Sequence, residues 1–347
     1  MPSTSLFFPK RLKGTALGIQ AGIGNFGVSL AQFVTPVILS IALYGAPSTF
    51  TKIDVKEAKE IFATTSLDQQ AQLFSTLDLK KQEAILSNVD AKVLDSVKAA
   101  INSRDHSQIF VSLPLATKSK IIDNANPKLA EIFLETLRPG NKAVTNQEIY
   151  IQSAAFWYVP FLIIMAILSW FYLKSIPMKA SITEQLDIFK SKHTWYCTIT
   201  YLMTFGTFAG LSAAFPLMIK FLYGEFPGAP DPLKYAFYGP LIGSASRVLF
   251  GFIADKVGGA ILTTITGLGI LGGTVILVTQ GLVAPTSMEQ FPLFVGIILM
   301  IFFFTGVGNA GTFRQYPIIF GDNPRQAAGV IGWTAAVAAF GPFIFSK

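Results

Sequence analysis

The most regular feature of the chain is a series of long apolar stretches separated by polar loops. Each stretch approaches or exceeds the ~20 residues that a helix needs to cross a bilayer. The pattern predicts seven membrane segments, at roughly 14–44, 151–173, 195–222, 235–254, 259–283, 291–319 and 327–346. We therefore expect an all-α integral membrane protein, interrupted by one long polar insertion between its first two segments.

The insertion, residues 45–149, is free of glycine between Gly45 and Gly140. Its apolar residues recur at helical spacing, as in Leu73, Phe74 and Leu77. Regular leucine, isoleucine and phenylalanine argue against a disordered segment, because disordered chains lack such residues. The pattern predicts a small helical domain, whose function the sequence does not indicate.

Composition supports the membrane class. Hydrophobic residues make up 51% of the chain and charged residues only 14%, whereas a soluble domain carries about a quarter charged residues. The insertion holds 13 basic and 13 acidic residues, so the whole net charge of +7 lies in the rest of the chain. A nucleic-acid partner is not expected, because these charges sit mainly at the ends of apolar segments.

The basic loop residues indicate an orientation. They are Lys10, Arg11, Lys13, Lys174, Lys179, Lys190, Lys192, Lys256 and Arg325. If the segments alternate, all these residues fall on one side. Because positive loops face the cytoplasm, we expect an inner-membrane protein with a cytoplasmic N-terminus and an extracytoplasmic insertion.

The chain also contains a distant repeat. The residues Arg11, Gly18, Phe26 and Gly27 recur 314 positions later as Arg325, Gly332, Phe340 and Gly341. In both places a basic loop leads into a helix rich in small residues. This favours a transporter built from two parallel halves.

Arg247 is the strongest functional candidate. It precedes Asp255 by eight residues, which is about 12 Å along a helix from the expected loop. An arginine at that depth is costly and usually functional, and the distance is long for a side chain that would reach the interface. Its planar guanidinium suits a planar oxyanion.

Other candidates have a structural explanation beside the functional one. Tyr201 and Phe205 share a helix face, where they either pack or hold an anion. Asn25 either binds substrate or joins two helices, since a buried amide in lipid needs partners. Asn309 lies in another glycine-rich stretch. Asp255 and Lys256 follow Arg247 in a short loop that is typical of a gating or structural contact.

Several chemistries are disfavoured. None of the predicted segments has an Asp or Glu well inside it, and the sequence lacks phosphate-loop, zinc-protease and nucleophile-elbow motifs. One cysteine, Cys197, and two separated histidines, His106 and His193, offer no metal-ligand spacing. We expect neither an enzyme, nor a cofactor, nor a metal site.

Several motifs carry a specific resemblance. The stretches "SLFFPKRLKGTALGIQAGIGNFGVSLAQFVTP", "TYLMTFGTFAGLSAAFPLMIK", "GPLIGSASRVLFGFIADKVGG" and "TGVGNAGTF" occur in this order. They resemble the nitrate/nitrite porters of the major facilitator superfamily. The resemblance implies twelve helices in two halves, of which this chain supplies helices 5 to 11. It also implies that a separate chain could supply helices 1–4.

The resemblance further implies roles for individual residues. Nitrate in the family lies between two arginines flanked by aromatic residues, and Arg247, Tyr201 and Phe205 match one arginine and an aromatic pair. Asn25 matches the signature helix, together with Gly22, Gly24 and Gly27. Two features depart from the family: Ala338 stands where glycine is favoured, and the insertion is not typical.

The resemblance divides the chain into five expected parts. They are a cytoplasmic lead and signature helix (1–44), the extracytoplasmic insertion (45–149), the last helix of the N-terminal half (150–175), a cytoplasmic linker (176–194) and an incomplete C-terminal half (195–347). The expected function is transport of a small inorganic anion by alternating access. The expected anion is nitrate, either taken up, as in nitrate assimilation, or exchanged for nitrite by an antiporter. The alternatives are a non-transporting remnant or subunit of a split transporter, and a facilitator for another anion or an organic solute.

Overall fold

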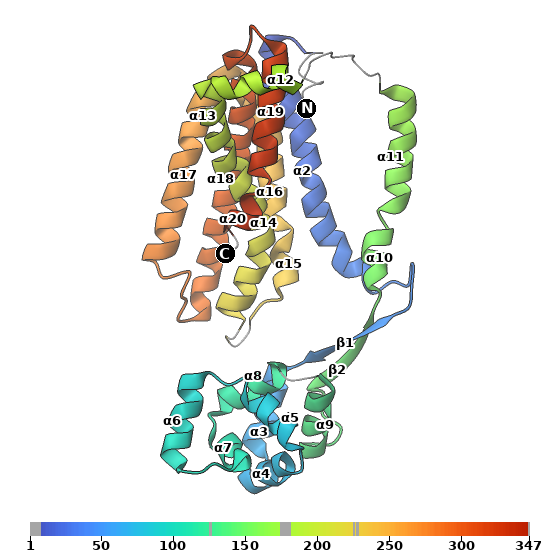
Figure 1. The fold of residues 1–347 in the computed structure, drawn as a ribbon, viewed down its shortest axis with the longest axis vertical. Helices are drawn as coiled ribbons and strands as arrows, with labels where there is room; N and C mark the ends of the chain where they lie inside the picture. The colour runs from blue at the N-terminus through green and yellow to red at the C-terminus, as the bar shows by residue number, and fades with distance from the viewer. Residues whose placement is uncertain (1–7, 125–126, 174–181, 225, 227–228, 346–347) are drawn as a thin grey trace. The chain divides into compact units, whose positions relative to one another are not determined.

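The computed structural model describes residues 8–124, 127–173, 182–224, 226 and 229–345. The chain folds into two compact units (Figure 1). The first combines Met1–Ile38 with Tyr158–Lys347, and the second is Leu39–Trp157. Each unit has its own core and is described by itself.

The first unit is entirely helical in its described residues. Its elements are η1 (Lys10–Leu12), α2 (Lys13–Ile38), α11 (Val159–Tyr172), α12 (Ile182–Gln185), η2 (Leu186–Lys190), α13 (Lys192–Tyr201), η3 (Leu202–Gly206), α14 (Thr207–Met218), η4 (Ile219–Tyr223), α15 (Pro232–Ala236), α16 (Tyr238–Val257), α17 (Gly259–Thr279), η5 (Met288–Gln290), α18 (Phe291–Ile319), α19 (Pro324–Ala338) and α20 (Gly341–Phe345). The π-helical turn η3 joins α13 to α14, and the π-helical turn η4 extends α14, so that Lys192–Tyr223 form one continuous helix.

Six helices among the described residues are long and apolar enough to cross a membrane. They are Lys10–Ile38, Ile151–Tyr172, Lys192–Tyr223, Pro232–Val257, Gly259–Thr279 and Met288–Ile319. The predicted all-α membrane architecture is therefore confirmed, and the chain is a multi-pass membrane protein.

The seventh predicted segment, 327–346, is not one helix. It divides into α19 and α20 at Ala339 and Phe340. Pro342 cannot donate a helical hydrogen bond, and a side chain at Gly341 would overlap the backbone of Gly206. The break therefore lets α20 lie against the η3 turn.

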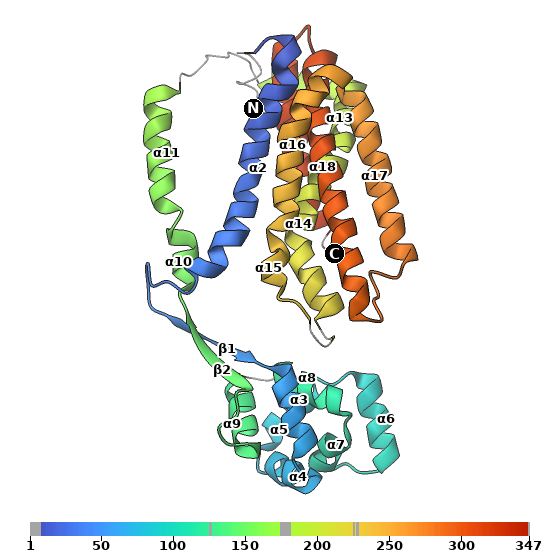
Figure 2. The same ribbon diagram turned by 180° about the vertical axis from the view of Figure 1, so that it is seen from behind.

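Close helix packing around α16 organises the first unit. Figure 2 shows α16 and α18 side by side, between α2 and α17. A Cβ atom at Gly18 would lie 2.9 Å from the Cα of Gly251, so the small residues of α2 let the two backbones touch. The hydroxyl of Ser246 donates to the carbonyl of Phe303 at 3.1 Å and joins α16 to α18.

The described residues of the second unit form eight short helices and a two-stranded ribbon. Its elements are β1 (Ser48–Ile53), α3 (Val55–Thr64), α4 (Leu67–Ser75), α5 (Leu79–Leu86), α6 (Ala91–Ile101), α7 (His106–Ser112), α8 (Leu115–Asn124), α9 (Pro127–Leu137), β2 (Val144–Ile149) and α10 (Ile151–Phe156). The antiparallel register runs from Ser48 opposite Ile149 to Ile53 opposite Val144. The helices match the expected spacing, but this ribbon was not predicted, because it pairs segments far apart in the sequence.

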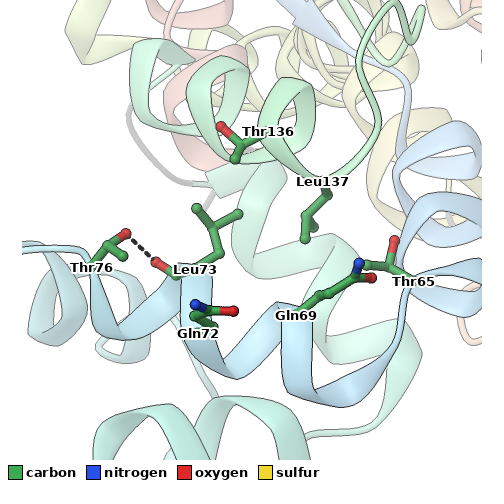
Figure 3. Close-up of a pocket in the computed structure, with 7 residues that line it drawn as sticks. All are labelled: Thr65, Gln69, Gln72, Leu73, Thr76, Thr136 and Leu137. Carbon is green, nitrogen blue, oxygen red and sulfur yellow. Dashed lines mark hydrogen bonds between the residues drawn. The ribbon is translucent and has the colours of Figure 1, made fainter.

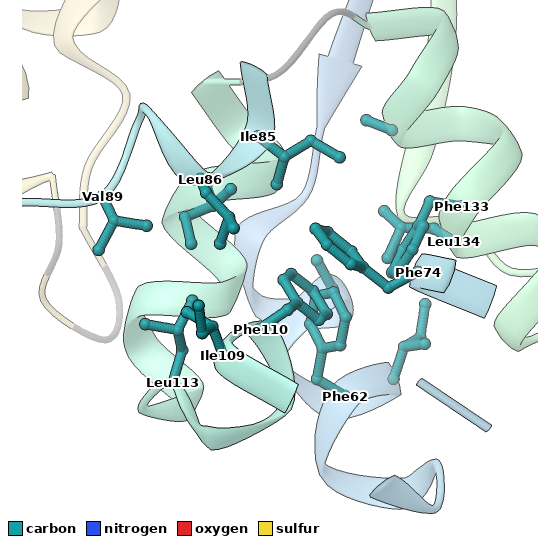
Figure 4. Packing of buried hydrophobic residues seen from close by; sticks show 14 of the residues in the cluster. Phe62, Phe74, Ile85, Leu86, Val89, Ile109, Phe110, Leu113, Phe133 and Leu134 are labelled. Atoms are coloured by element: carbon teal, nitrogen blue, oxygen red, sulfur yellow. The ribbon is translucent and has the colours of Figure 1, made fainter. Parts of the chain in front are cut away.

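Aromatic rings fill the centre of the second unit (Figure 4). Phe74 stacks on Phe110 with centroids 4.4 Å apart, and Phe133 meets Phe110 edge to face at 5.6 Å. Such pairs add about 0.5–1.5 kcal/mol each beyond the burial of their area. The ribbon joins the entering and leaving chain, so the unit is a compact domain inserted at one place.

Lys118 is buried against this aromatic core. Its ammonium donates to the Gln70 side-chain oxygen at 3.0 Å and lies 5.7 Å from the centre of the Phe110 ring. The Gln70 amide donates in turn to the carbonyls of Phe62 and Thr65. Burial lowers the pKa of Lys118, because it penalises the charged form.

A cavity of about 280 Å³ opens between α4 and α9 (Figure 3). Its lining is mostly amide and hydroxyl groups, from Thr65, Gln69, Gln72, Leu73, Thr76, Thr136 and Leu137. The hydroxyls of Thr76 and Thr136 donate to carbonyls of their own helices. The cavity is thus lined by uncharged side chains, both polar and apolar.

Candidate functional site

Arg247 lies near the middle of α16 and is completely buried. Its guanidinium carbon is 4.7 Å from the centre of the Phe313 ring, a cation–π contact with α18. Within the described residues, none of its three side-chain nitrogens has a hydrogen-bond partner of normal geometry. Because a buried arginine remains charged and needs partners, the structure leaves a set of donors unmatched.

Aromatic rings line the neighbourhood of Arg247. The ring of Tyr201 stacks on that of Phe205 with centroids 5.2 Å apart, and it meets Phe313 edge to face at 5.1 Å. The Tyr201 hydroxyl lies beside the guanidinium and interacts with it electrostatically and as a hydrogen-bond partner, although not with the geometry of a normal hydrogen bond. The structure thus places Tyr201 beside Arg247 and Phe205 against Tyr201, while their role in binding an anion stays a prediction.

A π-helical turn follows Tyr201 directly. This turn, η3, contains Phe205 and ends at Gly206. Such turns insert one extra residue into a helix and are frequent at functional sites. Since the turn is also where α20 packs, the orientation of the ring pair depends on contacts at the break between α19 and α20.

Two amides add further unmatched polar groups. Asn309 is fully buried on α18, one turn before Phe313, and neither its amide nitrogen nor its oxygen has a partner among the described residues. The amide nitrogen of Asn25 on α2 is likewise buried and unmatched. Buried polar groups are nearly always hydrogen-bonded, so both amides are candidates for contact with a ligand.

The glycines of α2 separate into two faces. A Cβ atom at Gly22 would clash with Val248 of α16, so Gly22 serves close packing. Gly24 and Gly27 are exposed, and a Cβ at either would meet no described atom within 4 Å. These two residues therefore lie on a face of α2 that the described residues do not cover.

Asp255 caps the start of α2. Its carboxylate accepts from the backbone amides of Gly14 at 2.9 Å and Thr15 at 2.7 Å, and from the Thr15 hydroxyl at 2.7 Å. Arg314 pairs with it at 2.9 Å and donates to the carbonyl of Lys10. A helix N-terminus favours a carboxylate, so this contact ties three helices together.

The structure separates the two predicted gating residues. Asp255 enters this network, whereas the neighbouring Lys256 has an exposed side chain. Arg314 completes the cap through its ion pair with Asp255. The gating role itself stays a prediction.

The second copy of the repeat lies at the start of α19. Arg325 pairs with Asp187 of η2 and donates to the carbonyl of Glu184. A hydrogen bond from Gln326 and the nearby Arg325 lower the pKa of the Asp187 carboxyl. Beside this pair is a cavity of about 460 Å³, lined by Gln185, Asp187, Ile188, Arg325, Ala328, Gly329 and Gly332.

Sequence reasoning missed two residues of the site. Phe313, which lies over Arg247, comes four residues after Asn309 and so shares its helix face; this spacing could have identified it. Ser244 is 1% exposed and its hydroxyl has no partner among the described residues. The sequence shows that Ser244 precedes Arg247 by three residues, but only the structure shows that its hydroxyl has no hydrogen-bond partner among the described residues.

These observations define the class of protein. The chain is a multi-pass, all-helical membrane protein with a buried cationic and aromatic site. The described residues contain no cluster of histidine, cysteine or carboxylate side chains that could hold a metal ion.

Known proteins resemble the chain along its whole length. It is 44% identical over 350 residues to the "Probable nitrate/nitrite antiporter NarK2" of Thermus thermophilus, covering all of this chain and 58% of that protein. It is 26% identical to the "Nitrate/nitrite transporter NarU" of Salmonella typhimurium and to that of Escherichia coli, covering 59% of each. The chain is thus similar along its whole length to proteins named as nitrate/nitrite transporters, and it spans somewhat under two thirds of the length of these relatives.

The insertion matches a different family. Residues 48–143 match the family described as "MgtE intracellular N domain", and these residues run from β1 to the start of β2 in the second unit. The description places that domain inside the cell, whereas the charge pattern of this chain predicts an extracytoplasmic insertion. The two indications disagree on the side of the membrane.

Proposed function

We propose that the chain forms part of a nitrate transporter, working by nitrate uptake or by exchange of nitrate for nitrite. The observation that carries this proposal is the buried, unmatched guanidinium of Arg247 beside Tyr201 and Phe313. Homology to proteins named as nitrate/nitrite transporters supports the choice of anion. The proposal assigns no catalytic step to the chain.

The anion would occupy the donors that are otherwise unmatched. The guanidinium of Arg247 offers a planar fork to two oxygens of a planar oxyanion, and the amides of Asn25 and Asn309 supply further hydrogen bonds. Tyr201 and Phe205 would bound the anion. Gly22 would hold α2 close to α16 beside the site, and Gly24 and Gly27 would let another helix approach the open face of α2. A fixed cationic site that is costly to leave empty favours exchange over net release.

Alternating access would need the ends of the helices to separate. We propose that Asp255 acts as a latch, since one carboxylate holds α2, α16 and α18 together at this end. Lys256, exposed beside it, would set the local charge of the loop. Breaking this cap lets the helix carrying Asn25 move relative to the helix carrying Arg247.

We propose that a separate chain supplies helices 1–4. The exposed face of α2 with Gly24 and Gly27 offers one contact surface. The cavity at α19 offers a second contact surface, because its lining belongs to the second copy of the repeat, whose first copy is packed against another helix. The lining residues Arg325, Ala328, Gly329 and Gly332 correspond, at an offset of 314, to Arg11, Gly14, Thr15 and Gly18. In the first copy Gly14 and Thr15 bind Asp255 and Gly18 contacts Gly251, whereas a Cβ at Gly332 would meet no described atom within 4 Å.

Uptake of labelled nitrate into proteoliposomes tests two of these proposals, nitrate transport and the need for a separate chain. One sample holds this chain alone, and the other adds the part of Thermus thermophilus NarK2 that lies outside the matched region. We expect saturable uptake and nitrate/nitrite counterflow only in the second sample, because the added segment would supply the helices that we assign to a partner. Transport by the chain alone would remove the need for a partner. No transport by folded protein in either sample would instead favour a remnant or another solute.

We propose the inner membrane as the location, with the second unit on the extracytoplasmic side. The expected result is that an impermeant maleimide labels Lys98→Cys, on α6, in intact cells, but labels Lys256→Cys only after the membrane is opened. Both side chains are exposed, and a Cys197→Ser background removes the native thiol. The reverse pattern would show that the second unit is intracellular, as in the family it matches.

A further inference from the structure

Two serines on α16 have opposite surroundings, although both are buried. Ser246 is 3% exposed and donates to the carbonyls of Gly243 and Phe303, so its hydroxyl is satisfied by a contact with α18. Ser244 is 1% exposed, and its hydroxyl has no partner among the described residues. A buried serine on a helix usually donates to the carbonyl four residues earlier, and Ser244 does not.

The position of Ser244 relates it to Arg247. The two are three residues apart on one helix, and residues with this spacing share a face about one turn apart. The α2 helix covers this side, because a Cβ at Gly22 would lie 3.2 Å from the Ser244 carbonyl oxygen. The unmatched hydroxyl is enclosed by protein, since Ser244 is 1% exposed, and α2, the helix beside it, also carries the unmatched amide nitrogen of Asn25.

The number of oxygens on the anion gives the hydroxyl a specific use. An arginine fork grips two oxygens of a planar anion, and nitrite has only two. Nitrate has a third oxygen, which needs a donor outside the fork. A buried group that hydrogen-bonds a substrate discriminates against an analogue that lacks the matching atom, because the group is then left unpaired.

We infer that Ser244 is a specificity-determining residue that donates its hydroxyl to the third oxygen of nitrate and so favours nitrate over nitrite. The inference rests on the proposed function, since it assumes that Arg247 binds these anions. It adds a direct contact and a selectivity that homology does not assign.

Thermal unfolding of the purified full chain, titrated with nitrate or nitrite, tests the inference without transport. Ser244→Ala should raise the nitrate concentration for half-maximal stabilisation about tenfold, the usual effect of losing a hydrogen bond to a charged group. The nitrite concentration should change less than about threefold, since the lost bond is not made to nitrite. Ser244→Thr keeps the hydroxyl and should retain the preference for nitrate.

Ser246→Ala is the matched control. It should lower the unfolding temperature of the empty protein, because it removes one hydrogen bond between α16 and α18. It adds no atoms that would push the two helices apart, so both half-maximal concentrations should stay unchanged. Equal weakening of nitrate and nitrite in Ser244→Ala, or no weakening of either, would overturn the role of Ser244. Absence of any stabilisation by either anion, both for the unaltered chain alone and with the Thermus thermophilus NarK2 segment added, would overturn the proposed function, and the inference with it.

Discussion

Replacing Arg247 with methionine is expected to weaken nitrate binding about 100-fold or more, while raising the stability of the empty protein. Losing one partner of a buried, hydrogen-bonded charge pair costs about 2–5 kcal/mol. Without the anion, the guanidinium is buried with no normal hydrogen bond among the described residues, and an apolar residue of similar length removes that cost. Replacing buried ionic groups with apolar ones often stabilises by about 1–4 kcal/mol.

The two effects are measured on the same sample. Thermal unfolding without ligand gives the stability, and nitrate titration gives the affinity. Arg247→Lys should have a nitrate affinity between that of the unaltered protein and that of Arg247→Met, since lysine keeps the charge but loses the planar fork.

Arg314→Met is the control for Arg247. This second arginine pairs with Asp255 at 2.9 Å, so its removal should lower stability and leave nitrate affinity nearly unchanged. If Arg247→Met destabilised the empty protein and bound nitrate normally, the arginine would have a structural role only.

Much of the architecture was predictable from local pattern. Long apolar stretches identify the spanning helices, because a bilayer requires an uninterrupted run of such residues. The seventh segment shows where this reasoning ends. Its composition is as apolar as that of the others, but the division into α19 and α20 depends on Gly341 meeting Gly206 of a different helix.

The site was predictable only in part. The depth of Arg247 in an apolar stretch is a property of the sequence, and the spacing of Tyr201 and Phe205 indicates one face. The contact with Phe313, however, depends on how α16 crosses α18. The cap formed by Asp255 on Gly14 and Thr15 joins residues about 240 positions apart, and no local pattern reports such a pairing.

The exposed glycines of α2 illustrate the difference between motif and role. Gly22, Gly24 and Gly27 belong to one motif, yet Gly22 is enclosed by α16 while the other two face no described atom. The motif therefore serves two surfaces of one helix. Only the enclosed surface is explained by the packing of this chain, and the open surface is the one that we assign to a partner.

Gly306→Ala is expected to destabilise the first unit by about 3 kcal/mol or more. A Cβ at Gly306 would overlap the Ser246 hydroxyl and the backbone oxygen of Gly243, and backbone cannot move aside as a flexible side chain can. Overpacking usually costs about 1–3 kcal/mol, and here the shift would also break the hydrogen bond from Ser246 to Phe303. Since α16 carries Arg247 and α18 carries Phe313, nitrate affinity should fall as well.

The same helix provides the opposite case. A Cβ at Gly296 would meet no described atom within 4 Å, so Gly296→Ala should be neutral or stabilise the helix by up to about 1 kcal/mol, the difference in helix propensity. The measurement is the unfolding temperature and the yield of monodisperse protein in detergent for both variants. Equal behaviour of the two would contradict the close crossing of α16 and α18. If only Gly306→Ala lowers stability and yield, the close crossing of α16 and α18 is required for the fold. The same crossing places Arg247 over Phe313, so the site depends on it as well.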